Sequence, residues 1–258
     1  MPDTLTYTVR LDAPGPPRPH EALHASFYEA LTRVSPELSE NIHQAPVVPF
    51  ALELGPQDDR EIKFRVHSLQ DEVTEALLAA WALGEPLTRR GEVTVHGELS
   101  AVARDRWNFE ELLEPLQRRP VRVDVQFTTV TAFKHNGAVV RWPSPQLMWG
   151  GLAQRWSRFG PDMAGVDYDQ IRLFRLQLRD TEILLHRHHG RVHIPAFTGA
   201  ASYELSAKAS HALALLRFGA RVGVGTQTGY GFGRIEIGEV RPISLERRRV
   251  KPANETDA

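Results

Sequence analysis

The sequence contains no cysteine among its 258 residues. Disulfides, thiolate metal sites and cysteine nucleophiles are therefore excluded, and acid and base chemistry is left to the eleven histidines and the side chains around them. No stretch approaches the roughly 18 uninterrupted apolar residues that a membrane-spanning helix requires. The first residues, MPDTLTYTVRLDA, lack a basic segment followed by an apolar run, so we expect no secretory signal, no membrane partner and a cytoplasmic location.

Strong net charge is also missing, but the charges are unevenly distributed. Residues 1–120 carry 12 Lys and Arg against 20 Asp and Glu, which gives −8, whereas residues 121–258 carry 19 against 12, which gives +7. A basic half favours a polyanion that binds mainly on one side, because phosphates neutralised by Lys and Arg release counterions. Chance fluctuation of charge between the halves is the alternative.

Strand and helix patterns occur twice in the same order. Alternating or apolar segments predict strands, and apolar residues at helical spacing predict helices. In the first half the predicted order is strand 4–11, helix 20–34, strands 47–54 and 61–69, helix 71–83 and strand 92–104. In the second half the order is strand 121–133, helix 144–159, strands 171–185 and 191–205, helix 206–220 and strand 234–243. Each set has the ferredoxin-like βαββαβ order.

The repeated order predicts an α+β protein with two tandem ferredoxin-like domains. We place the first domain at residues 1–120 and the second at 121–246, because the segment LQRRP at 116–120 interrupts helical periodicity before a strong strand pattern. Residues 247–258 form a polar tail that we expect to fray.

A glycine-rich stretch, GVGTQTGYGFGR at 223–234, lies between the last helix pattern and the last strand pattern. It is not a dinucleotide fingerprint, because the glycine spacing differs and a strand rather than a helix follows. It is not a nucleoside triphosphate loop, because no lysine is present. Two interpretations remain: a loop whose N–H groups bind phosphates, or a tight crossover between two domains.

The sequence resembles the RAMP superfamily of CRISPR systems, and specifically its repeat-processing, Cas6-like endoribonucleases. The similar segments are the glycine-rich stretch after HALALLRFGA, together with FTTVTAFKHNG, WPSPQLMWGGLAQRW, VHIPAFTGAASYEL and NIHQAPVVPFAL. The resemblance implies a nuclease that needs no metal or organic cofactor and cuts precursor CRISPR RNA within its repeats. It further implies repeat RNA as the partner and hand-over to an interference complex, and it leaves a homodimer open.

The resemblance also points to catalytic residues. His43, which we expect in a loop bounded by Pro46, matches the histidine that precedes a strand in this family, and Tyr28 matches a catalytic tyrosine of some members. His24 lies one helical turn before Tyr28, so the two side chains share a face. Histidine can act as acid or base near neutral pH. The assignment of base and acid among the three residues stays open.

Family members with this spacing tend to have a lysine shortly after the histidine, but here the segment is APVVPF. The candidate replacements are Lys63, Arg65, Arg18 and Lys134. The residues that we expect to contact RNA are Gly223, Gly225, Thr226, Gln227, Thr228, Gly229, Gly231, Gly233, Arg234, Lys134, Arg155 and Arg158.

Several features have simpler interpretations. The cluster HRHHG at 186–190 fits a hairpin tip better than a metal site, and Trp149 and Trp156 share a helix face that fits core packing better than base stacking. Two rival functions remain: a non-catalytic RAMP subunit that holds guide RNA in an effector complex, and a ferredoxin-like enzyme acting on a small molecule.

Overall fold

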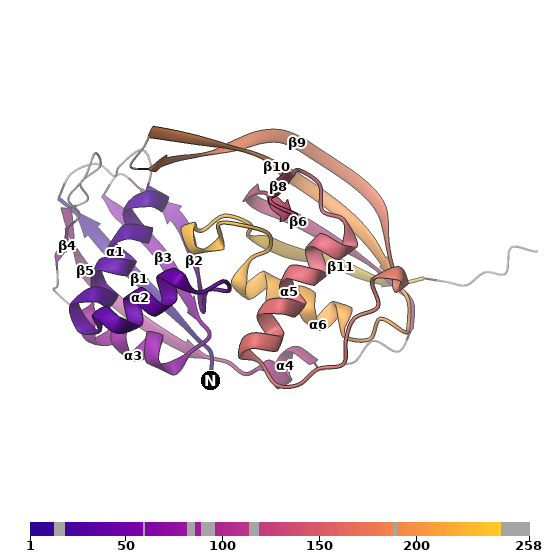
Figure 1. The fold of residues 1–258 in the computed structure, drawn as a ribbon, viewed down its shortest axis with the longest axis horizontal. Coiled ribbons are helices and arrows are strands. Elements are labelled where there is room, and N and C mark those ends of the chain that lie inside the picture. The colour runs from indigo at the N-terminus through magenta and orange to yellow at the C-terminus, as the bar shows by residue number, and fades with distance from the viewer. Residues whose placement is uncertain are drawn as a thin grey trace, which may run out of the picture.

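The structure is a computed structural model that describes residues 1–12, 19–58, 60–81, 86–88, 96–113, 119–187 and 190–243. Its first half contains β1 (Asp3–Leu11), α1 (Pro19–Val34), α2 (Pro36–Gln44), β2 (Phe50–Gln57), β3 (Glu61–Ser68), α3 (Asp71–Ala80), β4 (Pro86–Thr88), β5 (His96–Arg106) and α4 (Phe109–Leu113). Its second half contains β6 (Val121–Thr131), β7 (Phe133–His135), β8 (Ala138–Val140), α5 (Pro145–Phe159), the 3₁₀ turn η1 (Tyr168–Gln170), β9 (Ile171–Arg187), β10 (Gly190–Leu205), α6 (Ala212–Val222), η2 (Thr228–Tyr230) and β11 (Ile235–Pro242). The two halves lie side by side (Figure 1).

Each half is built on an antiparallel sheet with ferredoxin-like strand order. The first sheet has the order β2-β3-β1-β5-β4 and the second has the order β11-β6-β10-β9. The four strands of the βαββαβ unit are β1, β2, β3 and β5 in the first half and β6, β9, β10 and β11 in the second. In both sheets these strands lie in the spatial order second, third, first and fourth, with the short β4 added at the edge of the first sheet. The predicted tandem ferredoxin-like fold is therefore confirmed.

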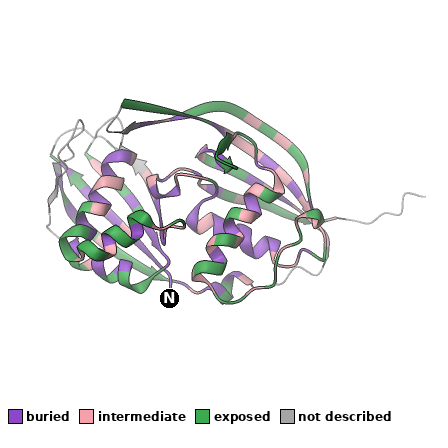
Figure 2. Cartoon of the chain, in the orientation of Figure 1, coloured by how far each residue is buried: buried purple, intermediate pink, exposed green. Residues whose placement is uncertain are grey.

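Helices cover one face of each sheet and bury its apolar residues. In β1, Leu5, Tyr7 and Val9 alternate toward α1 and α3 and are at most 1% exposed. In the second half, Trp149 and Trp156 of α5 are fully buried in the core beneath the second sheet, which confirms their predicted packing role. Figure 2 shows buried positions as bands on the strands and on the inner helix faces.

The segment between the halves packs with the second half. Trp107, Phe109 and Leu112 belong to the same hydrophobic cluster as Trp156 and Phe218. The segment that joins β5 to β6 therefore contributes to the second core, which also includes Ala51 and Leu69 of the first half. The boundary that we predicted near residue 120 stays a prediction.

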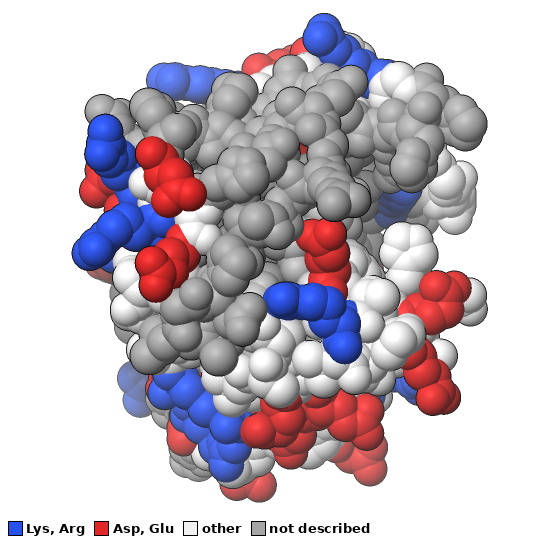
Figure 3. Space-filling view, turned by 90° about the vertical axis from the view of Figure 1, so that its left-hand side faces the viewer, with Lys and Arg blue, Asp and Glu red and all other residues white. Residues whose placement is uncertain are grey.

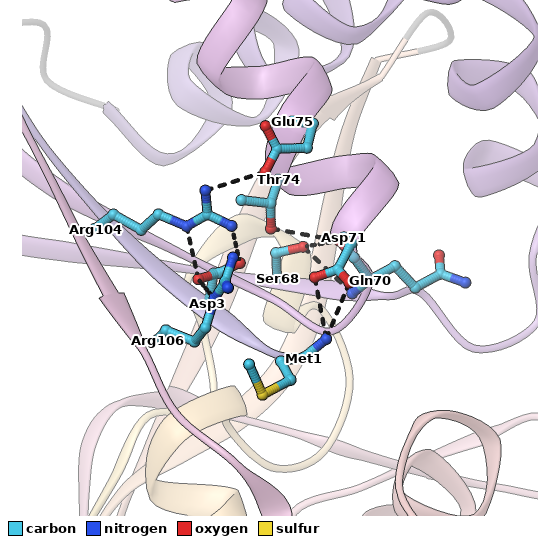
Figure 4. Close-up of polar contacts among 9 residues, drawn as sticks. All are labelled: Met1, Asp3, Ser68, Gln70, Asp71, Thr74, Glu75, Arg104 and Arg106. Carbon is cyan, nitrogen blue, oxygen red and sulfur yellow. Dashed lines mark hydrogen bonds and ion pairs between the residues drawn. The ribbon is translucent and has the colours of Figure 1, made fainter.

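A buried carboxylate fixes the first strand to its neighbours. Asp3 is fully buried and accepts hydrogen bonds from Arg104 Nε and Nη2 at 2.9 and 2.8 Å. Arg104 also pairs with Glu75 of α3, and the amino group of Met1 pairs with Asp71 at the start of that helix (Figure 4). This network ties β1, β5 and α3 together.

Several helices differ from the sequence-based prediction: α2 and α4 were not predicted, α3 ends at Ala80 rather than at residue 83, and α6 is displaced. The prediction that His43 lies in a loop is wrong, because residues 36–44 form α2, with Pro36 in its first turn and the Ser35 hydroxyl accepting from the N–H of Leu38 at 3.3 Å. His43 is in the last turn of that helix. The last helix begins at Ala212 rather than at residue 206.

The exterior of the first half is not uniformly acidic. Figure 3 shows both acidic and basic side chains on the end face that this half forms, with acidic side chains gathered along its lower edge. In the part of the chain that the structure describes, no helix is both long enough and apolar enough to cross a membrane.

Candidate active site at the domain junction

A cavity of about 410 Å³ lies where the two halves meet. Its walls come from α1, α2, the segment that leads into β2, α5 and the glycine-rich segment 223–230, which we call the glycine loop. The lining residues are His24, Tyr28, His43, Pro46, Val47, Val48, Phe50, Gly151, Leu152, Gln154, Arg155 and all residues from 223 to 230. The three predicted catalytic residues therefore line one cavity with most of the predicted RNA-binding loop.

The rings of His24, Tyr28 and His43 contact one another in sequence, with Tyr28 in the middle. The ring centroids of His24 and Tyr28 are 5.1 Å apart, and those of Tyr28 and His43 are 5.3 Å apart, both in edge-to-face arrangements. His24 and Tyr28 are half-buried, whereas His43 is exposed at the end of α2. The helical spacing of His24 and Tyr28 brings them together, and α2 brings His43 to the same side.

His24 is held in a defined orientation by the glycine loop. Its Nδ1 is 3.0 Å from the carbonyl oxygen of Gly229, and its ring stacks on Tyr230 with centroids 3.6 Å apart. A carbonyl oxygen can only accept a hydrogen bond, so Nδ1 carries the hydrogen. The neutral imidazole therefore has its proton-accepting nitrogen at Nε2.

Tyr28 is a hydrogen-bond donor at neutral pH. Burial, together with the nearby Tyr230, raises the pKa of the Tyr28 hydroxyl to about 12. The hydroxyl therefore stays protonated throughout the neutral range. It can donate to a bound anion but is a poor base there.

The conformation of the glycine loop and the following residues requires glycine at several positions. Gly223, Gly225, Gly231 and Gly233 have φ values between +74° and +88°. A Cβ at Gly225 would lie 2.2 Å from the carbonyl oxygen of Ala132, and a Cβ at Gly233 would lie 2.0 Å from another main-chain oxygen. The close-approach interpretation from the sequence therefore has a structural basis at these positions.

The same loop presents main-chain donors. Among the described residues, no acceptor lies within hydrogen-bonding reach of the N–H groups of Gly225, Gln227, Thr228 and Gly229. All four residues line the cavity. Gln227 itself has φ +65°, and successive N–H groups around such left-handed residues form anion-binding concavities.

Arg155 is the cation in the cavity wall. Its guanidinium donates to the carbonyl oxygen of Val222 at 2.9 Å and to the Thr228 hydroxyl at 2.8 Å. Burial lowers the pKa of Arg155 to about 10, so the side chain remains positively charged at neutral pH. Arg155 was expected to contact RNA, but sequence did not place it among the candidates for the missing lysine.

The other predicted cations lie elsewhere. Lys63 and Arg65 line a separate cavity of about 310 Å³, and Lys134 and Arg158 are exposed outside the walls of the first cavity. Arg18 lies outside the described residues, as do His188 and His189 of the predicted hairpin tip.

Arg234 is engaged in an ion pair between the two halves. Its Nη2 is 2.6 Å from Glu53 Oε2, and its side chain is 11% exposed. Gly231 and Gly233, also predicted to contact RNA, lie outside the cavity walls. The predicted roles of these three residues in RNA binding stay predictions.

Tyr230 is a cavity residue that sequence reasoning missed. It stacks on His24 and lies between two glycines of the predicted loop. The sequence gives little indication that Tyr230 belongs to the site. Its stacking partner His24 lies 206 positions earlier in the chain, so no local pattern connects the two residues.

Two ferredoxin-like halves, with a glycine-rich loop of the second half facing histidines of the first, agree with the resemblance to the RAMP superfamily. The family model described as CRISPR-associated endoribonuclease Cas6 matches residues 125–235. The Cas6-like resemblance that we predicted from the sequence is confirmed by this match and by the following relatives and structures.

Two of the following three similar proteins cover most of the chain. A CRISPR-associated endoribonuclease Cas6 of Mycobacterium tuberculosis is 25% identical over 260 residues, covering 92% of this chain and 79% of that protein. A CRISPR-associated endoribonuclease Cas6 of Streptococcus thermophilus is 32% identical over 119 residues, covering 44% of this chain and 49% of that protein. A Thermus thermophilus Cas6 product complex has a TM-score of 0.75 and 25% identity, covering 92% of this chain and all of that one.

Proposed function

We propose that this chain is a metal-independent endoribonuclease that cleaves precursor CRISPR RNA within its repeats to release guide RNAs. One observation carries the proposal: His24, Tyr28 and His43 converge on a single cavity that the glycine loop lines from the other half. The similar proteins support the substrate, since they are Cas6 endoribonucleases and one was solved as a product complex. The charge of +7 on residues 121–258 also favours RNA.

The reaction needs only the RNA and side-chain proton transfer. A base removes the proton of a 2′-hydroxyl, whose oxygen attacks the adjacent phosphorus, and an acid protonates the departing 5′-oxygen. The phosphorus–oxygen bond that breaks is replaced by the one that forms, which leaves a 2′,3′-cyclic phosphate and a 5′-hydroxyl. No oxidant, reductant or metal enters this balance.

The cavity offers a group for each requirement. His43 and His24 serve as the base and acid, with the Nε2 of neutral His24 able to accept a proton because Nδ1 donates to Gly229. Tyr28 donates a hydrogen bond to a phosphate oxygen because its hydroxyl stays protonated. Arg155 and the N–H groups of Gly225, Gln227, Thr228 and Gly229 stabilise the charge that develops on the phosphate.

The decisive experiment is incubation with labelled repeat RNA in excess EDTA. We expect cleavage of the all-ribose substrate and none of the same RNA with a 2′-deoxy nucleotide at the cut site. The His43→Ala variant should lose about 10²- to 10⁴-fold in the rate of cleavage, the usual contribution of a general acid or base.

A matched control is His193→Ala, because His193 is an exposed histidine of β10 that pairs with Glu182 away from the cavity. This variant should cleave at the parent rate. Cleavage that EDTA abolishes would contradict metal independence. Tight RNA binding without cleavage would instead identify a guide-holding RAMP subunit. Equal cleavage by His43→Ala and the parent chain would remove His43 from the catalytic set.

A further inference from the structure

Two histidines of α1 bond to the main chain of the glycine loop. His20 Nδ1 lies 2.8 Å from the carbonyl oxygen of Tyr230, and His24 Nδ1 lies 3.0 Å from that of Gly229. Because a carbonyl oxygen only accepts, both imidazoles donate from Nδ1. Residues one helical turn apart in the first half thus bind consecutive carbonyls of the second half. We call these two contacts the histidine clasp.

The clasp binds the two carbonyls at the end of the short turn η2. The short turn η2 uses the carbonyls of Gln227 and Thr228, which accept from the N–H groups of Tyr230 and Gly231 at 2.9 and 3.0 Å. The next carbonyls, of Gly229 and Tyr230, come at the end of the turn, where a helix has no internal donor left for them. The two histidines supply these donors from another domain.

His20 is packed as a fixed part of this junction. Its ring stacks on Phe232 with centroids 4.8 Å apart, and a Cβ on Gly231 would come within 3.0 Å of His20 Nδ1. Burial lowers the pKa of His20, against the opposing effect of the Tyr230 carbonyl, so the ring is neutral near pH 7. His20 is not among the residues that line the cavity.

We propose that His20 is a positioning residue for the cleavage reaction, which acts by holding the Tyr230 carbonyl and thereby the loop N–H groups over the cavity that contains His43. This inference rests on the proposed function, since it concerns the same cavity. It assigns no proton transfer to His20. Its effect reaches the substrate only through the loop.

Two substitutions separate the effect of the hydrogen bond that His20 donates from the effect of its ring packing. His20→Phe keeps a ring that can stack on Phe232 but removes the donor, whereas His20→Asn keeps an N–H donor near the place of Nδ1. His20→Phe should lower kcat for repeat RNA about fivefold and change KM less than about twofold, since one hydrogen bond of about 1 kcal/mol is lost. Amide hydrogen exchange of residues 225–232 should become faster, and His20→Asn should restore both measurements.

Glu29→Ala is the matched control, because Glu29 is exposed on the same helix and does not line the cavity. It should behave like the parent chain in both assays. Parent-like kcat and exchange in His20→Phe would overturn the proposal. Equal losses in the Phe and Asn variants would also overturn it, by showing that the ring and not the donor matters.

The two proposals can fail separately. If the parent chain cleaves no repeat RNA, the proposed function fails, while the exchange rates of the Phe and Asn variants still decide whether the clasp holds the loop. If His20→Phe does not fold, His20→Asn decides alone: parent-like exchange and kcat support the clasp, and fast exchange with low kcat contradicts it.

Discussion

Replacing Glu53 with glutamine should loosen the junction between the two halves. The Glu53 carboxylate lies 2.6 Å from Arg234 Nη2, 2.9 Å from His67 Nε2 and 2.9 Å from Arg65 Nη1. The Glu53 and Arg234 side chains are only 18% and 11% exposed. Removing one partner of a buried ion pair leaves the other charge uncompensated and typically costs about 3–5 kcal/mol. We expect Glu53→Gln to lower the free energy of unfolding by about 3 kcal/mol, at the lower end of this range, because both side chains keep some contact with solvent.

The pH dependence of stability gives a second estimate of what the Glu53 carboxylate contributes to the free energy of unfolding. Burial raises the pKa of Glu53, but the hydrogen bond with His67 and the charges of Arg234 and Arg65 outweigh it and hold the pKa at about 2, below the ordinary 4.5. The resulting stabilisation of about 3 kcal/mol is complete above pH 4.5 and is lost as the pH falls from 4.5 toward 2. Burial also lowers the pKa of His67 to about 4 from 6.5, so a separate loss begins as the pH falls below 6.5.

Urea unfolding at pH 7, 5 and 3 measures both effects. The matched control is Glu61→Gln, whose partner Lys63 is 54% exposed at a distance of 3.0 Å, and which should cost less than about 1 kcal/mol. Glu53→Gln should also flatten the loss of stability between pH 4.5 and 2. If Glu53→Gln costs no more than Glu61→Gln at pH 7, the carboxylate does not hold the halves together and our reasoning is refuted.

Three further substitutions and one control test the fold by chemical denaturation. Tyr7→Phe should leave the free energy of unfolding unchanged or raise it by about 1 kcal/mol, because no partner for the buried Tyr7 hydroxyl lies among the described residues; a clear loss would contradict this. Asp3→Asn should cost about 3 kcal/mol, since it leaves Arg104 without its buried carboxylate, and a cost under about 1 kcal/mol would refute the role of that pair. Gly233→Ala should cost more than about 2 kcal/mol because of its φ of +74° and a main-chain oxygen 2.0 Å from the added Cβ, whereas Gly151→Ala in α5 should be neutral or stabilising.

The sequence was sufficient to predict the fold because its signals are local. Alternation of apolar residues in 4–11 and helical spacing in 20–34 require no knowledge of the other domain. The pairing of His24 with Tyr28 is predictable for the same reason, since both lie on one helix face. The helix that contains His43 was missed, although Ser35 followed by Pro36 is a recognisable helix start.

The rest of the candidate site depends on how the domains pack against each other. The bond between His20 and Tyr230 joins residues 210 positions apart, and Arg155 becomes part of the cavity wall only when α5 packs beside the glycine loop. The pairing of Glu53 with Arg234 has the same origin. None of these contacts has a periodic or spacing signal, because each joins elements whose relative placement is decided by the folded interface.

This arrangement also connects the two interpretations of the glycine-rich stretch. Gly233 serves the close approach of main chains, whereas Gln227, Thr228 and Gly229 supply N–H groups to the cavity. The crossover fixes the loop against the first domain, and only a loop fixed there can present donors opposite His43. Since the cavity takes walls from both halves, neither half contains the candidate site alone. The interdomain contacts of His20, His24 and Glu53 join the same two halves that form the cavity.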